Sequence, residues 1–144
     1  MIETFGGIML ECLILGDSLA VGVGQIRQEC TTRAKSGINS YDYVNRHIWH
    51  TNGNNQAKTI IISLGSNDTK NIKTFEELDT LRQLVKADRV YWIVPAIKED
   101  KRKAVWAVAN KHHDHVIETR NHDLSPDRVH PTGKGYKTIS NQTK

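Results

Sequence analysis

Short apolar runs alternate along this chain with longer segments in which apolar residues recur every three or four positions. A short continuous apolar run is typical of a strand buried on both faces, and the longer period is typical of an amphipathic helix. Five strands are predicted: Leu10–Leu15, Cys30–Ala34, Thr59–Leu64, Val90–Val94 and His115–Glu118. Three consecutive isoleucines at positions 60–62 make the third strand the clearest of them.

Helices are predicted between these strands and after the last one. They cover Leu19–Gln28, Tyr41–Trp49, Phe75–Lys86 and Asp100–His112, with a final helix after Pro131. Thr74 followed by Glu77 resembles a capping box at the start of the third helix. The polar segment Thr51–Asn55 is expected to form a loop. Strands that alternate with helices favour a parallel sheet covered by helices on both faces.

The length of 144 residues suits one domain with a core of its own. No repeat, linker or low-complexity tract divides the chain. We therefore expect a single domain over residues 1–144, with residues 1–8 as a loose N-terminal extension. An apolar content of 38% and a charged content of 25% are ordinary for soluble domains, so composition points to a globular protein.

The net charge of +4 comes from lysines and arginines that are scattered along the chain. This scatter indicates an excess of cationic side chains spread over the solvated surface. No basic stripe with interleaved aromatic residues is visible, so nucleic-acid binding is not expected. No apolar run reaches the ~18 residues of a membrane span. The N-terminus lacks the basic region of a signal peptide. The default expectation is a cytoplasmic protein, with a virion-associated or mature secreted form as open alternatives.

The two cysteines do not form a disulfide framework. Cys12 lies in the first apolar run and is interpreted as a small core residue, while Cys30 stands where the second strand should begin. A bridge requires close Cα atoms, and nothing in the sequence requires one. A metal site among the three histidines that surround Asp114 is conceivable, but they lack a spaced set of ligands, so a solvated surface is the preferred interpretation.

Ser18 stands where the first predicted strand turns into a helix. A serine hydroxyl is a poor nucleophile unless a base removes its proton and donors stabilise the oxyanion that forms. At a helix start, the serine N–H is a free backbone donor and the helix dipole favours negative charge. The simpler interpretation of Ser18 is a helix N-cap. The preceding Asp17 is expected to shape the turn.

Four other residues could complete such a site. Gly37 follows the second predicted strand, Asn67 follows the third, and Asp127 and His130 come after the fifth. Ligands of open parallel sheets bind beyond the carboxyl ends of the strands. The predicted elements therefore gather all of these residues with Ser18 at one edge of the sheet.

The order Gly-Asp-Ser, isolated Gly, Gly-x-Asn-Asp and Asp-x-x-His-Pro resembles the SGNH, or GDSL, hydrolases. The resemblance covers about Leu10 to Tyr136, nearly the whole chain. It implies the flavodoxin-like SGNH fold, which is a three-layer α/β/α sandwich around a five-stranded parallel sheet.

The resemblance also implies a carboxylic ester hydrolase with a serine nucleophile. Ser18 would attack the ester, His130 would act as general base, and Asp127 would orient the imidazole. The oxyanion hole would consist of the Ser18 N–H, the Gly37 N–H and the Asn67 side-chain amide. Neither a cofactor nor a metal is implied.

The chain is short for this family, so we infer an open, shallow site that suits a small acyl group, such as acetyl, on a carbohydrate. Trp49 lies beside a polar loop and is a candidate surface aromatic, while Trp92 and Trp106 are expected in the core. Two alternatives stay open. One is a lysophospholipase or thioesterase for longer acyl chains. The other is a non-catalytic carbohydrate-binding module on the same scaffold. The sequence does not indicate an oligomeric state.

Overall fold

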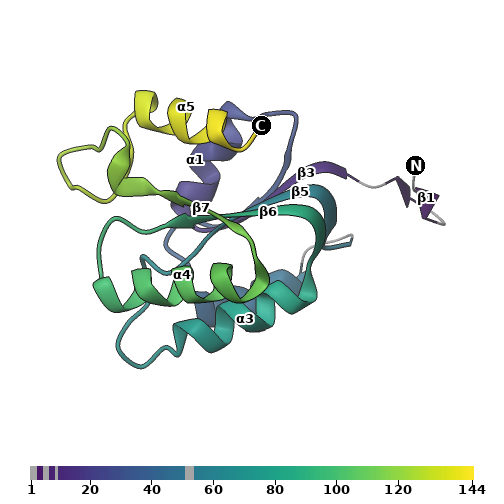
Figure 1. The fold of residues 1–144 in the computed structure, drawn as a ribbon, viewed down its shortest axis with the longest axis horizontal. Coiled ribbons are helices and arrows are strands. Elements are labelled where there is room, and N and C mark those ends of the chain that lie inside the picture. The colour runs from purple at the N-terminus through teal and green to yellow at the C-terminus, as the bar shows by residue number, and fades with distance from the viewer. Residues whose placement is uncertain (1–2, 5–6, 9, 51–53) are drawn as a thin grey trace.

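The structure is a computed structural model that describes residues 3–4, 7–8, 10–50 and 54–144. Near the N-terminus, β1 (Glu3–Thr4) and β2 (Gly7–Ile8) pair as a small antiparallel ribbon, apart from the main sheet (Figure 1). The expected extension at residues 1–8 and the expected loop at residues 51–55 both include positions outside the described residues. In the part of the chain that the structure describes, no helix is long and apolar enough to cross a bilayer.

The main sheet contains five parallel strands in the order β4-β3-β5-β6-β7. They are β3 (Leu10–Gly16), β4 (Thr31–Ala34), β5 (Gln56–Ser63), β6 (Lys86–Val94) and β7 (His115–Glu118). The first strand of this sheet lies between the second and the third, which is the flavodoxin-like order. The predicted five-stranded parallel sheet is confirmed. The order reverses at β3, where the crevice of such folds is found.

Helices cover both faces of the sheet, as expected (Figure 1). One face carries α1 (Ser18–Ile26) and α5 (Gly133–Gln142), and α3 (Thr74–Leu84) and α4 (Glu99–His112) lie on the other. Shorter elements are α2 (Ser40–Asn45), η1 (His47–His50) and η2 (Thr119–Asn121). The three-layer α/β/α arrangement is therefore confirmed.

The helix predicted over Tyr41–Trp49 is two pieces, α2 and η1, separated at Arg46. The side-chain amide of Asn45 donates to the Tyr41 carbonyl at 2.8 Å. Asparagine side chains compete with the backbone in this way, so helices tend to end near them.

The predicted capping box at Thr74 is wrong. Lys73 is the N-cap of α3, and the Thr74 hydroxyl donates to the Asp68 carboxylate at 2.7 Å. A contact with the loop directly before α3 therefore takes the hydroxyl that capping would need. Lys86, predicted as helical, begins β6 because it pairs with Gln56 of β5.

Two apolar cores flank the sheet because successive strand residues point to opposite faces. Leu13, Ile60, Ile62 and Trp92 pack beneath α2, α3 and α4. Ile14, Leu19, Val23, Ile61 and Ile139 belong to the core on the α1 and α5 face. Trp92 is fully buried, as predicted. The expectation for Trp106 is wrong: this side chain is 37% exposed, and its Nε1 donates to Glu118.

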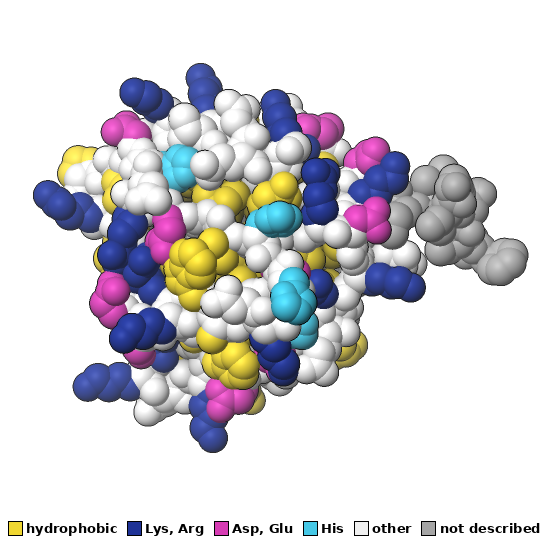
Figure 2. Space-filling model, in the orientation of Figure 1, with side chains coloured by type: hydrophobic (Ala, Val, Ile, Leu, Met, Phe, Trp, Pro, Cys, Tyr) yellow, Lys and Arg dark blue, Asp and Glu magenta, His cyan; other side chains and the backbone are white. Residues whose placement is uncertain are grey.

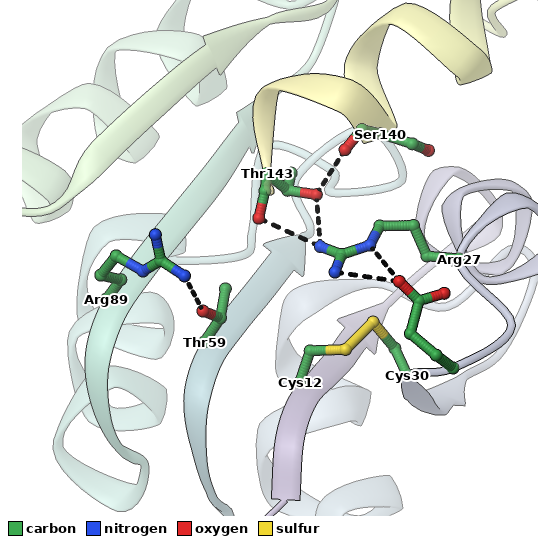
Figure 3. Close-up of a disulfide and its surroundings, with 8 residues drawn as sticks. Cys12, Arg27, Cys30, Thr59, Arg89, Ser140 and Thr143 are labelled. Atoms are coloured by element: carbon green, nitrogen blue, oxygen red, sulfur yellow. Dashed lines mark hydrogen bonds and ion pairs between the residues drawn. A yellow bond between two sulfur atoms is a disulfide. The ribbon is translucent and has the colours of Figure 1, made fainter.

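A disulfide joins Cys12 and Cys30 across a Cα–Cα distance of 4.8 Å (Figure 3). Cys12 is buried in the core, as predicted, but it belongs to a bridge that nothing in the sequence required. The cause is the parallel register of β3 and β4: Leu13 lies opposite Thr31, so the cysteines that precede them also face each other. Beside the bridge, Arg27 donates to the Thr143 carbonyl and hydroxyl, which joins the end of α1 to the C-terminus (Figure 3).

Candidate active site

The turn after β3 is pressed against β5. Gly16 has a φ of +135°, a region that favours glycine, and a Cβ at this position would collide with the Ser63 carbonyl. That carbonyl accepts a hydrogen bond from the Asp17 N–H at 2.9 Å. The close approach therefore requires glycine and sets the position at which Ser18 enters α1.

Asp17 is the N-cap of α1, which corrects the simpler interpretation of Ser18 as the cap. The Asp17 Oδ1 atom accepts from the Leu19 N–H at 3.1 Å and from the Ser63 hydroxyl at 2.9 Å. The side chain is fully buried, and burial raises the pKa of Asp17 to about 6. Because the aspartate caps the helix, the Ser18 hydroxyl has no capping role and is available to another partner.

Ser18, His130 and Asp127 form a continuous hydrogen-bonded chain. The Ser18 Oγ lies 3.0 Å from the His130 Nε2, and the His130 Nδ1 lies 2.7 Å from the Asp127 Oδ2. Hydrogen bonds from the backbone and then the side chain of His130 hold the pKa of Asp127 at about 2. An ionised carboxylate can only accept, so the proton sits on Nδ1 and Nε2 is left to accept from Ser18.

The loop that carries His130 is held by hydrogen bonds between its own residues. Leu124 and Pro131 form an antiparallel bridge, and the Ser125 N–H donates to the His130 carbonyl at 2.8 Å. Within the loop, the Asp127 Oδ1 accepts from the N–H groups of Val129 and His130 at 2.8 and 2.9 Å. The spacing of three residues therefore places carboxylate and imidazole together, as the sequence predicted.

The predicted oxyanion donors come from three different loops. The Ser18 N–H belongs to the first turn of α1, where backbone donors have no intrahelical acceptor. Gly37 has a φ of +82°, and a Cβ there would meet nothing within 4 Å, so its backbone borders open space. The Asn67 Nδ2 donates to the Ile38 carbonyl at 3.0 Å. An amide nitrogen carries two hydrogens, which leaves the second for a substrate oxygen.

Sequence reasoning missed the residue that connects these loops. Asp68 is buried, and its two carboxylate oxygens accept from the Ser40 N–H at 2.8 Å and from the Thr74 hydroxyl at 2.7 Å. It therefore holds the start of α2, just beyond Gly37, against the start of α3. A second link runs from the Lys35 N–H to the Gly16 carbonyl. The contact with Thr74 spans only six positions, whereas the link from Asp68 to Ser40 spans 28 and leaves no local pattern in the sequence.

The alternative metal site near Asp114 gains no support. The Asp114 carboxylate accepts from Arg82 and from the Trp92 indole, and the His112 imidazole contacts Asp79. Among the residues that the structure describes, no cluster of three or more His, Cys, Asp or Glu side chains could hold a metal ion. Structural pairing therefore accounts for Asp114 and His112.

The sequence matches no protein-family model and no curated protein. Solved structures are similar in fold. A GDSL-like lipase from Bacteroides thetaiotaomicron superposes with a TM-score of 0.65 at 15% identity, over 92% of this chain and 84% of that one. A lipolytic G-D-S-L family member from Veillonella parvula gives a TM-score of 0.62 at 15% identity, over 92% and 94% of the two chains.

A carbohydrate acetylesterase family member from Sinorhizobium meliloti also superposes, with a TM-score of 0.62 at 12% identity, over 91% of this chain and 94% of that one. These neighbours share the five-stranded parallel sheet flanked by helices. The chain therefore has the fold of the SGNH, or GDSL, hydrolases.

Proposed function

We propose that this protein is a serine ester hydrolase that removes small acyl groups, such as acetyl, from a carbohydrate. The observation that carries the proposal is the hydrogen-bonded chain from Ser18 through His130 to Asp127. This arrangement supplies a nucleophile, a base and an orienting carboxylate, the three parts of a serine hydrolase triad. The lipolytic and esterase names among the structural neighbours agree with ester hydrolysis.

The reaction begins when the Ser18 Oγ attacks the ester carbonyl and its proton passes to the His130 Nε2. The carbonyl oxygen gains negative charge, which the Ser18 N–H, the Gly37 N–H and the Asn67 amide stabilise. The intermediate then collapses, the C–O bond to the alcohol breaks, and His130 returns the proton to the leaving alcohol. Water, deprotonated by His130, attacks the acyl-serine; the bond between the acyl carbon and the Ser18 Oγ then breaks, the acid leaves, and His130 returns the proton to the Ser18 Oγ.

The surroundings of Gly37 support a small acyl group on a polar carrier. An open groove of about 350 Å³ borders this glycine, and among the described residues that line it Ile38 has the only large apolar side chain. A long acyl chain would require an apolar channel, because burial of apolar surface drives its binding. The carbohydrate acetylesterase among the neighbours is compatible with a sugar carrier.

The disulfide supports a location in an oxidising compartment rather than in the cytoplasm.

The proposal is tested by hydrolysis of p-nitrophenyl esters of increasing acyl length by the wild-type protein and by Ser18→Ala. We expect turnover of the acetate and butyrate esters that Ser18→Ala reduces at least about a thousandfold. A matched control is Ser140→Ala, since Ser140 is a buried serine on α5 whose hydroxyl has no hydrogen-bond partner among the described residues.

Equal background rates in the wild type and Ser18→Ala would refute the catalytic role and favour the carbohydrate-binding module. Rates that rise with acyl chains longer than about six carbons would instead favour the lipid or thioester alternative, since longer chains gain from an apolar channel. Mass spectrometry adds a direct readout: an acetylated peptide containing Ser18 should accumulate briefly after mixing with the acetate ester.

A further inference from the structure

The groove beside Gly37 carries an excess of positive charge. Lys35 and Gly37 from the β4–α2 loop line one part of it, and Arg46, His47 and His50 from the end of α2 and from η1 line another. Asp42 is the only carboxylate among the described residues that line it. The groove therefore brings together two permanent cations and two histidines next to a proposed oxyanion donor.

The single carboxylate does not neutralise this group. Asp42 accepts from the Asn39 side chain at 3.3 Å and lies 3.6 Å from the Arg46 guanidinium. No carboxylate among the described residues lies within ion-pair distance of the Lys35 ammonium group. One positive charge therefore remains uncompensated even when both histidines are neutral.

His47 is held in place by its neighbours. The His47 ring packs on Tyr43 with a centroid distance of 5.0 Å, and the Tyr43 hydroxyl donates to the Arg33 carbonyl at 2.6 Å. Burial lowers the pKa of His47, and the nearby charges of Lys35 and His50 lower it further. The neutral imidazole expected there still offers one N–H donor among the residues that line the groove.

We propose that this groove binds an anionic group on the carrier of the ester, a carboxylate or a sulfate on an acidic sugar, and so selects acidic glycans over neutral ones. The inference rests on the proposed function in treating the Gly37 side of the site as the substrate side. A sugar is favoured over a lipid because six of the eight described residues that line the groove have polar or charged side chains. Trp49, between Ile48 and His50 on η1, is 64% exposed and offers an aromatic face for a sugar ring.

The test is a binding measurement, which does not depend on turnover. Isothermal titration calorimetry of the full chain would compare trigalacturonate, which carries carboxylates, a sulfated carrageenan tetrasaccharide, and neutral xylotriose. We expect at least one anionic sugar to bind about tenfold or more tightly than xylotriose, with an affinity that falls as salt is added. The two anionic sugars distinguish carboxylate from sulfate recognition.

The double variant Lys35→Gln/Arg46→Gln should lower the affinity for the preferred anionic sugar about fivefold to tenfold and leave the affinity for xylotriose unchanged. The matched control Lys103→Gln/Lys137→Gln removes the same charge from exposed positions on α4 and α5, outside the groove, and should bind as the wild type does. Circular dichroism would show that both double variants keep the fold.

Equal affinity for anionic and neutral sugars would overturn the proposal, as would an equal loss in both double variants, which would indicate only a general charge effect. Tighter binding of a short oligonucleotide than of either anionic sugar would overturn it in favour of a nucleic-acid ligand. If Ser18→Ala proves as active as the wild type but selective binding is found, the groove proposal stands and the catalytic proposal fails.

Discussion

Asp17 should make the protein less stable as pH rises through the mildly acidic range. Its carboxyl is fully buried, one oxygen accepts two hydrogen bonds, and Oδ2 has no partner among the described residues. Burial raises its pKa from 3.8 to about 6. The native state therefore binds more protons than the unfolded state between about pH 4 and 6, and its stability falls as pH rises through this window.

The size of the effect follows from the shift. Each pKa unit is worth about 1.4 kcal/mol, so ionised Asp17 costs the folded state about 3 kcal/mol above pH 6. Asp17→Asn keeps the oxygen that accepts from Leu19 and Ser63 but cannot ionise. Relative to the wild type, the variant should therefore gain roughly 2 to 3 kcal/mol of unfolding free energy between about pH 4 and 7. Any constant difference between the two side chains cancels in this comparison.

The assay is urea unfolding of both proteins at about one-unit pH intervals, with the disulfide intact and the fluorescence of buried Trp92 as the signal. Other titrating groups contribute equally to both proteins, so the difference isolates Asp17. Parallel stability profiles would refute the reasoning and mean that the carboxyl is better solvated than its burial indicates. A further variant, Ser63→Ala, removes a donor that lowers the pKa of Asp17, so the loss of stability should become larger and extend to higher pH.

Three other changes test the remaining parts of the structure. Asp127→Asn should reduce kcat about a thousandfold or more, measured with p-nitrophenyl acetate, because the carboxylate that holds the imidazole tautomer is lost; a loss below tenfold would contradict this role. Asn67→Ala removes one oxyanion donor and should lower kcat about a hundredfold with little change in KM, and a change confined to KM would argue against it. Cys12 and Cys30 are 18 positions apart, so reduction of their disulfide should lower the free energy of unfolding by about 3 kcal/mol. The measurement compares urea unfolding in the presence and in the absence of dithiothreitol.

Much of the fold could be predicted because its strands are buried on both faces. A run such as residues 60–62, three isoleucines, is compatible with few environments other than the centre of a parallel sheet. Helix ends were harder to predict, since side-chain contacts with adjoining loops decide them. The Thr74 hydroxyl bonds to Asp68 rather than capping α3. The exposed Trp106 shows the same limit, because its indole is satisfied by Glu118 on a neighbouring strand.

The candidate site could be predicted as a set of residues but not as a geometry. Ser18, Gly37 and Asn67 each follow a strand, and parallel strands end at one edge. The spacing of Asp127 and His130 is local, so their contact could be expected within one turn. The distance between Ser18 and His130, which are separated by 112 positions, depends on how β3, β7 and the final loop pack.

The sequence by itself therefore determined the order of strands and helices, the parallel sheet and the residues that carry the proposed chemistry, because these depend on local periodicity and on which strand each motif follows. Only the tertiary structure decided that Asp17 caps α1 in place of Ser18, that Cys12 meets Cys30, and that cations gather beside Gly37. The bridge depends on strand register, and the groove depends on how the β4–α2 loop, α2 and η1 pack together; neither leaves a local pattern in the chain. Asp17 and Ser18 are both cap-forming residue types, and the hydrogen bonds between Asp17 and Ser63 of β5 decide between them.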